Sequence, residues 1–356
     1  MKILIVKTSA IGDVTHTLPA LNAIRQMYPA ALITWLIEEA AADIVMGHEN
    51  VDRVLVAKRK SWIRDLKKIR WKIAIREIWA FIRALRDTQY DILIDFQGLL
   101  KSSIWIFLAH AKRKIGFGKG MQHQEGSYIF LNEHIPAINM DTHAVDRELY
   151  LLSKIGLNIP KEIRFAIPIT DNDRIEIETL LYKKKVPKTK KLISIHPIVG
   201  WPTRLWIASR FSELADRLID TYNATIIFTG SVVDQKAIRE IQEKMKYSSV
   251  MLAGETTLLT LAALYEKSRL IVTTDTGPMH IAAAINQPVV AIFGPTAPWR
   301  TGPYTKKARV IRANLDCMPC FKRNCKTHAC MESIHVDDVL MGINALWNET
   351  ENLNAF

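Results

Sequence analysis

Near its amino terminus the chain reads Ile3-Leu4-Ile5-Val6-Lys7-Thr8-Ser9-Ala10-Ile11-Gly12-Asp13, an apolar run that passes directly into a polar turn. A continuous apolar run is typical of a central parallel strand that is buried on both faces. A helical pattern follows over 14–28, and further strands are predicted at 32–37, 53–56 and 91–95. Residues 62–85 carry apolar side chains at spacings of three to five, which predicts a helical stripe.

The second half of the chain repeats this alternation. Strands are predicted at 192–195, 225–228, 249–252, 270–273 and 289–293, with helical patterns at 208–221, 235–245, 258–267 and 278–285 between them. The pattern predicts an α/β fold with two doubly wound parallel-sheet domains. We place the domains at 1–170 and 191–356, joined by a polar linker at 171–190. Ligands of open α/β sheets bind beyond the carboxyl ends of the strands, which predicts a site in a cleft between the sheets.

Composition limits the class of protein. The 356 residues are 49% hydrophobic and 24% charged, which excludes a disordered chain. No apolar stretch approaches the roughly 20 residues that span a membrane, and the first residues lack the features of a signal peptide. We therefore expect a cytoplasmic protein.

The charge balance favours anionic partners. There are 48 Lys and Arg against 36 Asp and Glu, a net charge of +12. Residues 58–86 hold 11 basic and two acidic side chains, a net +9, interleaved with Trp62, Trp71 and Trp79. This segment is either a solvated helix face or a surface for an anionic partner such as nucleic acid, a membrane or a phosphorylated substrate.

The turn after the first strand is one candidate site. Gly12 permits a close backbone approach, and Asp13 lies at or near a helix start. Asp13 is therefore either a helix cap or a general base in the cleft. No Gly-x-Gly-x-x-Gly fingerprint follows the strand, which argues against a nicotinamide enzyme.

A second candidate is the turn Thr273-Thr274-Asp275-Thr276-Gly277-Pro278-Met279-His280. Pro278 suits a first helical turn, and the free N–H groups of a helix start attract a pyrophosphate. The turn Gly294-Pro295-Thr296 ends the next predicted strand. The alternative is an ordinary strand–turn–helix connection, with His280 packed in the core.

Together these motifs resemble glycosyltransferase family 9, the ADP-heptose:lipopolysaccharide heptosyltransferases. The resemblance rests on residues 5–21, on Asp95-Phe96-Gln97-Gly98-Leu99-Leu100-Lys101-Ser102, on Asp275-Thr276-Gly277 with His280, and on Gly294-Pro295-Thr296. Glu38-Glu39 and His143-Ala144-Val145-Asp146-Arg147 are similar to the subgroup that adds the first heptose to the sugar acid Kdo. The resemblance implies a GT-B fold of two Rossmann-like domains, the first binding the acceptor and the second the nucleotide sugar.

The family further implies an inverting, metal-independent transfer of heptose from ADP-L-glycero-D-manno-heptose to Kdo of the lipopolysaccharide inner core. Asp13 would be the general base, and Arg204 stands where the family usually has a lysine. The donor-binding residues implied are Asp234 (with Gln235 as an alternative), Asp275, Thr276, Gly277, His280, Gly294 and Thr296.

On the acceptor side, the predicted contacts with Kdo-lipid A are Lys7, Thr8, Ser9, Gly12, Arg59, Lys60, Arg64 and Lys101. We expect the basic segment to touch the anionic cytoplasmic face of the inner membrane peripherally. No nucleic-acid partner is expected, because nothing resembles an RNA-binding module. Two other enzymes remain as alternatives: a family 9 transferase that acts on a heptose acceptor, and a sugar-nucleotide epimerase on the same scaffold.

All four cysteines, Cys317, Cys320, Cys325 and Cys330, lie within fourteen residues, with His328 among them. Four thiolates could hold a structural zinc ion or an iron–sulfur cluster, and a cytoplasmic location disfavours disulfides. Only one Cys-x-x-Cys pair is present, so free thiols or a redox pair are the alternative. No cofactor is expected for catalysis.

Overall fold

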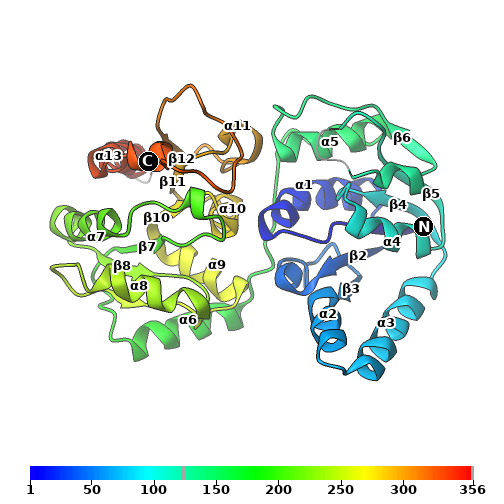
Figure 1. Cartoon of the computed structure of the whole chain (residues 1–356), viewed down its shortest axis with the longest axis horizontal. Helices are drawn as coiled ribbons and strands as arrows, with labels where there is room; N and C mark the ends of the chain where they lie inside the picture. The colour runs from blue at the N-terminus through cyan, green and yellow to red at the C-terminus, as the bar shows by residue number, and fades with distance from the viewer. Residues whose placement is uncertain (122–124, 354–356) are drawn as a thin grey trace. The chain divides into compact units, whose positions relative to one another are not determined.

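The structure is a computed structural model that describes residues 1–121 and 125–353. It divides into two compact units, Met1–Pro168 and Ile169–Phe356, each built around its own sheet (Figure 1). The two predicted parallel-sheet domains are therefore confirmed. The predicted linker at 171–190 is wrong, because Asp171–Lys183 is a helix that packs within the second unit.

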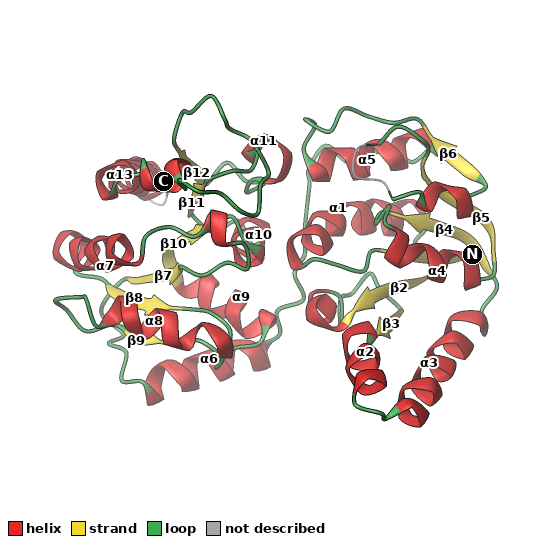
Figure 2. Ribbon diagram, in the orientation of Figure 1, coloured by secondary structure: helices red, strands yellow, loops and turns green. Residues whose placement is uncertain are grey.

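The first unit has six parallel strands in the order β3-β2-β1-β4-β5-β6. The strands are β1 (Lys2–Val6), β2 (Leu32–Glu38), β3 (Arg53–Ala57), β4 (Tyr90–Asp95), β5 (Ala111–Phe117) and β6 (Glu133–Ile135). The α-helices are α1 (Ile11–Met27), α2 (Arg59–Lys67), α3 (Trp71–Arg86), α4 (Leu100–Leu108) and α5 (Ala144–Lys154). Figure 2 shows these helices around the strands.

The second unit has the same topology, with strand order β12-β11-β10-β7-β8-β9. The strands are β7 (Leu192–His196), β8 (Thr225–Phe228), β9 (Val250–Met251), β10 (Ser268–Thr274), β11 (Val289–Phe293) and β12 (Ala308–Arg312). The α-helices are α6 (Asp171–Lys183), α7 (Ala208–Tyr222), α8 (Gln235–Gln242), α9 (Leu258–Lys267), α10 (Gly277–Ala284), α11 (Pro298–Thr301), α12 (Ala329–Glu332) and α13 (Val336–Leu353).

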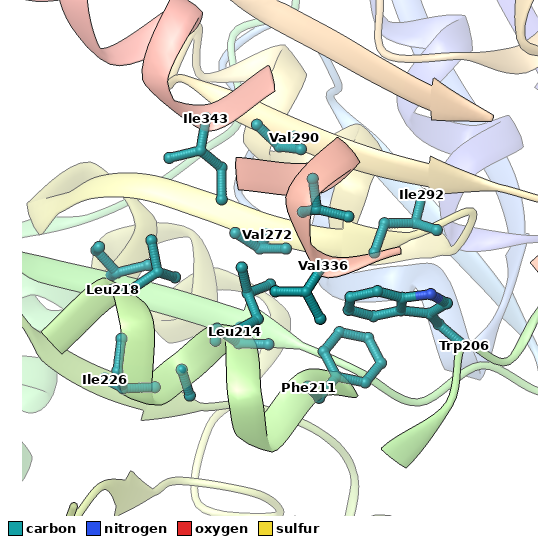
Figure 3. Close-up of a cluster of buried hydrophobic side chains, with 14 of the residues drawn as sticks. Trp206, Phe211, Leu214, Leu218, Ile226, Val272, Val290, Ile292, Val336 and Ile343 are labelled. Carbon is teal, nitrogen blue, oxygen red and sulfur yellow. The ribbon is translucent and has the colours of Figure 1, made fainter. Parts of the chain in front are cut away.

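The core of the second unit joins segments from both of its ends. Trp206 and Phe211, before and within α7, pack edge to face with ring centroids 4.9 Å apart. Val336 and Ile343 of α13 belong to the same buried cluster, together with Val272 of β10 (Figure 3). Helix α13 is thus an integral layer of this unit.

The predicted helical stripe over 62–85 is two helices and not one. α2 ends at Lys67 and α3 begins at Trp71, and Ile69 between them has a left-handed φ of 59°. The two helices are held together because the indole of Trp62 donates a 3.0 Å hydrogen bond to Glu77. Trp62 is buried, so it belongs to the core and not to a surface.

Within residues 1–121 and 125–353, no helix is both long and apolar enough to cross a bilayer.

Candidate functional site

Both sheets reverse their strand order at one place, and the candidate motifs lie there. In the first unit the order reverses between β1 and β4, and in the second between β7 and β10. Loops that leave two such strands at their carboxyl ends diverge to opposite faces and leave a crevice. The turn 7–13 follows β1, and the turn 275–277 follows β10. The topology therefore places both predicted sites where an α/β sheet binds its ligand.

Asp13 is the third residue of α1 and faces a pocket. Its Oδ2 accepts a 2.9 Å hydrogen bond from the backbone N–H of Ala10, so the carboxylate also caps its own helix. The pocket is small, about 250 Å³. Its charged lining residues are Lys7, Asp13, Asp95, Arg147 and Glu148. The two alternatives for Asp13, cap and site residue, are therefore compatible.

Lys7 is buried beneath this pocket in an ion pair. Its Nζ donates to Glu148 Oε1 at 2.8 Å and to the carbonyl oxygen of Phe96 at 2.9 Å. Burial lowers the pKa of Lys7, but the charges of Glu148 and Asp13 outweigh burial and raise it above its ordinary value. Burial raises the pKa of Glu148 in spite of the lysine. Lys7 thus fixes the floor of the pocket as a cation.

Asp95 and Gln97 shape the loop opposite the turn. Asp95 Oδ1 accepts the backbone N–H groups of Gln97 and Gly98 at 2.9 and 3.2 Å. Gly98 has a φ of 67°, a conformation that glycine adopts without strain. Burial raises the pKa of Asp95 to about 6, although these hydrogen bonds and Lys7 lower it.

Gln97 orients two of the predicted acceptor residues. Its Oε1 accepts hydrogen bonds from the backbone N–H of Thr8 at 2.8 Å, the Thr8 hydroxyl at 3.0 Å and the Ser9 N–H at 3.0 Å. The sequence analysis assigned no role to Asp95, Gln97, Arg147 or Glu148. Asp95, Gln97 and Arg147 stand in motifs quoted above, and the end of the predicted strand at 91–95 was the available signal for Asp95 and Gln97.

The remaining predicted acceptor residues are only partly brought together. Lys101 of α4 donates to the Ser9 hydroxyl and lies 3.8 Å from Glu38. Arg59 donates to the same Glu38 at 3.0 Å, so it joins this group. Gly12 is buried in the first turn of α1. Lys60 and Arg64 are exposed on α2, away from these contacts.

In the second unit, Asp275 is the centre of a buried network. Its Oδ2 lies 3.1 Å from Nη1 of Arg204 and accepts a 2.6 Å hydrogen bond from the Thr296 hydroxyl. The guanidinium of Arg204 also stacks on Trp201, 3.9 Å from the ring centroid. Three predicted donor-site residues from three separate loops therefore meet at one point.

Thr276 occupies the N-cap position of α10 without a side-chain capping hydrogen bond, and Gly277 is the first residue of the helix. The first N–H groups of a helix have no partner within it, and the helix dipole is positive at this end. Both features favour the binding of a phosphate. His280 is buried one turn further along. Gly294 is a close-approach position, since a Cβ there would meet Met331 Sδ at 2.5 Å.

Asp234 lies beyond the end of β8, at the start of α8. Its Oδ2 accepts the backbone N–H of Ser231 at 2.7 Å, whereas the side chain of Gln235 donates to the Ala253 carbonyl at 2.9 Å. His196, at the end of β7, is bonded to the Thr229 hydroxyl through Nδ1 at 3.0 Å. Burial lowers the pKa of His196 to about 4, so this ring is neutral at neutral pH.

Three of the four cysteines lie on the irregular segment after β12, and Cys330 lies in the short helix α12. Cys317 and Cys325 are exposed and Cys330 is buried. Hydrogen bonds from the backbone N–H groups of Thr327 and His328 lower the pKa of the Cys325 thiol. A lowered pKa favours the thiolate, which is the form that binds metals. The described residues contain no group of three or more His, Cys, Asp or Glu arranged to hold a metal. Zinc at this segment stays a prediction.

A much larger groove, about 1490 Å³, lies at the opposite edge of the second sheet. It is bordered by the first residues of β7 and β10, Leu192 and Ser268, and by exposed lysines of residues 183–191. Ligands of such sheets bind at the carboxyl ends of the strands. We therefore place the functional site at that end of each sheet, where the turns after β1 and β10 lie.

Comparison with known proteins agrees with this geometry. The model of the family described as glycosyltransferase family 9 (heptosyltransferase) matches residues 78–331. Lipopolysaccharide heptosyltransferase 1 of Escherichia coli K12 is 30% identical over 324 residues, which cover 88% of this chain and 94% of that protein. The protein of the same name from Pseudomonas aeruginosa is 28% identical over 328 residues, 91% of this chain and 87% of that protein.

Solved structures show the same likeness. E. coli heptosyltransferase WaaC with ADP superposes with a TM-score of 0.78 at 26% identity, covering 97% of this chain and 100% of that chain. Its complex with ADP-2-deoxy-2-fluoro heptose gives a TM-score of 0.76 at 27% identity, with 97% and 99% covered. The predicted GT-B fold is thereby confirmed. Since the family match spans more than half of its length, the chain is a glycosyltransferase and belongs to family 9, the heptosyltransferases.

Proposed function

We propose that this enzyme transfers heptose from ADP-L-glycero-D-manno-heptose to a hydroxyl of Kdo in the lipopolysaccharide inner core, with inversion and without a catalytic metal. The observation that carries the proposal is the position of Asp13 in a pocket that also holds Lys7 and Arg147. An acidic sugar such as Kdo needs cations for its carboxylate and a base for its hydroxyl. The names of the E. coli and P. aeruginosa relatives support the lipopolysaccharide acceptor.

On the acceptor side, the Asp13 carboxylate takes the proton of the attacking hydroxyl as the new bond to the anomeric carbon forms. The bond from that carbon to the diphosphate breaks on the opposite face, so the anomeric configuration inverts. The hydrogen bond from Ala10 fixes one oxygen of Asp13, and the other oxygen remains for the hydroxyl.

On the donor side, ADP leaves with the electrons of the broken bond and gains negative charge on its diphosphate. Arg204 and the start of α10 supply positive charge for it. Asp275 is engaged by Arg204 and Thr296, which leaves it poorly suited to bind Mg²⁺. We expect the transfer rate to be the same without added divalent metal as with added Mg²⁺ or Mn²⁺, and a dependence on either ion would contradict a metal-independent reaction.

The decisive experiment is ADP release from ADP-heptose with Kdo₂-lipid A as acceptor, for the wild type and Asp13→Asn. The asparagine retains an oxygen for the Ala10 N–H but cannot take a proton. We expect turnover to fall by about 10²–10⁴-fold, the usual worth of a positioned base.

Asp171→Asn, an exposed change at the start of α6, is the matched control and should leave turnover unchanged. Full activity of Asp13→Asn would remove Asp13 from its role. Activity only on an acceptor that already carries heptose would instead favour the heptose-acceptor transferase, and turnover of the donor without any acceptor would favour an epimerase or hydrolase.

We also propose that the enzyme works peripherally at the anionic cytoplasmic face of the inner membrane. Helices α2 and α3 form a hairpin whose tip is residues 68–70 (Figure 1). Ile69 at the tip is 84% exposed, and Trp79 of α3 is 64% exposed. The other exposed large apolar side chains of the hairpin are Ile63, Leu66, Trp71, Ile73 and Ile75. Exposed apolar and basic groups together suit an anionic bilayer, in which each nearby Lys or Arg contributes about 1 kcal/mol.

Flotation with vesicles tests this surface. We expect the wild type to bind phosphatidylglycerol-containing vesicles and not pure phosphatidylcholine ones, and the triple change Ile69→Ser, Trp71→Ser, Trp79→Ser to abolish binding. Val232→Ser with Val233→Ser, two exposed apolar residues of the second unit, is the control. Equal binding by the triple variant and the wild type would rule out the hairpin as the membrane contact.

A further inference from the structure

The cysteine-bearing segment, defined here as residues 315–331, forms one wall of the Arg204 network. The hydroxyl of Thr203 donates to the carbonyl of Lys322 at 2.7 Å. The backbone N–H groups of Cys320 and Phe321 both donate to the carbonyl of Pro295, at 3.0 and 2.9 Å. These bonds attach the segment to the loop before α7 and to the turn after β11, which both contribute to the candidate donor site.

The segment brings a second arginine to the site. Arg323 lies over the ring of Trp201, 4.5 Å from its centroid, and Arg204 lies over the same ring at 3.9 Å. One half-buried indole therefore holds two guanidinium groups. Like charges repel, so two arginines sharing a single ring are at their most stable when an anion lies between or beside them.

The two arginines differ in how their charge is balanced. Arg204 is paired with the buried carboxylate of Asp275, which offsets much of its charge. Arg323 is exposed, and no carboxylate of the described residues lies within ion-pair distance of it. A diphosphate carries at least two negative charges, more than the Arg204–Asp275 pair can neutralise. Arg323 therefore brings to this point of the unit a positive charge that no carboxylate of the described residues offsets.

We propose that Arg323 binds the diphosphate of the nucleotide donor together with Arg204, with Trp201 as their common stacking surface. The inference rests on the proposed function for the identity of the donor. It assigns a ligand-binding role to the cysteine-bearing segment, which holds Arg323 in place through the bonds of Lys322, Cys320 and Phe321.

Calorimetric titration of the full chain with ADP and with adenosine tests the proposal. For Arg323→Ala we expect the Kd of ADP to rise by about 5–20-fold, since a charge-assisted hydrogen bond is lost from a partly exposed site. The Kd of adenosine should stay within about twofold, because adenosine has no phosphate. Arg323→Lys should give an intermediate loss for ADP, because lysine keeps the charge and loses the fork that matches a phosphate.

Lys326→Ala removes a neighbouring exposed cation of the same segment and should leave the Kd of ADP unchanged. Arg323 and Lys326 are exposed, so the variants at these two positions should melt at the wild-type temperature. An unchanged Kd of ADP in Arg323→Ala, with weakened binding in Arg204→Ala, would overturn the role of Arg323 and leave the proposed function intact. Equal weakening of ADP and adenosine would indicate a purely structural role and would also overturn it. If the wild type does not bind ADP, both proposals fail.

Discussion

At the scale of single residues, Asp95 is stabilised in its protonated form by the fold. Burial raises the pKa of its carboxyl to about 6, from an ordinary 3.8. The folded chain therefore holds this proton more tightly than the unfolded chain, and stability is lost as the pH rises from about 4 to about 6. We expect Asp95→Asn to raise the free energy of unfolding by roughly 1–3 kcal/mol at pH 7.5, with the gain vanishing near pH 4.

Urea unfolding across this pH range measures the effect. Asp52 is the matched control, because its hydrogen bonds to Ile33 N–H and Arg25 outweigh burial and lower its pKa. Asp52→Asn should therefore lower stability at pH 7.5, and the loss should shrink as the pH falls. A uniform destabilisation by Asp95→Asn at every pH would show that the carboxylate is needed in its ionised form.

The residues of the site were predictable where their chemistry is local. Gly12 and Asp13 follow an apolar strand directly, and Asp275 and Gly277 follow another. The partners of these residues were not predictable, because Gln97 and Glu148 reach the first turn from 89 and 141 positions away. A carboxylate such as Glu148, inside an amphipathic helix, carries no local sign that it will be buried against a lysine.

At the scale of elements, the features that the sequence prediction missed depend on contacts between segments that are distant in the chain. β5 reads Ala111-Lys112-Arg113-Lys114-Ile115-Gly116-Phe117, and its cations hide the strand pattern. In the sheet, Lys112 pairs with Asp91 of β4 at 2.9 Å and Arg113 pairs with Glu133 of β6 at 2.5 Å. The strand is stabilised by its neighbours, which sequence periodicity does not include. The break between α2 and α3 depends in the same way on the non-local contact of Trp62 with Glu77.

The cysteine-bearing segment is the element for which a metal remains predicted. Cys330 is buried, and burial raises the pKa of its thiol, as do the charges of Cys320, Cys317 and Cys325. We expect protein purified without chelator to contain about one zinc ion per chain by elemental analysis, and Cys317→Ser with Cys320→Ser to lose it. A zinc content near zero in the wild type would leave four free thiols.

At the scale of the whole molecule, two doubly wound parallel sheets were predictable from the alternation of strand and helix, but the boundary between the units was not. The sequence of segment 171–190 is mostly polar because α6 buries only one of its faces against the second unit. Ile177 and Leu181 are buried on that face, and Arg174 pairs with Glu266 of α9 at 2.8 Å. A short, highly charged amphipathic helix is easily mistaken for a linker when the helix that it packs against, here α9, lies about ninety residues away in the sequence.

This boundary leads to a prediction about the second unit in isolation. The large buried cluster of this unit draws on residues from Ile193 to Trp347, and its six strands form one sheet. We expect a fragment of residues 169–356 to unfold cooperatively and to bind ADP with the affinity of the full chain. A fragment starting at 191, the boundary predicted from the sequence, loses α6 and exposes its apolar contact on α9. Removal of the buried Ile177 and Leu181 alone should cost about 3–6 kcal/mol, a large share of the roughly 5–15 kcal/mol that stabilises a typical domain. Urea denaturation of both fragments measures the difference, and equal stability would show that α6 is a linker after all.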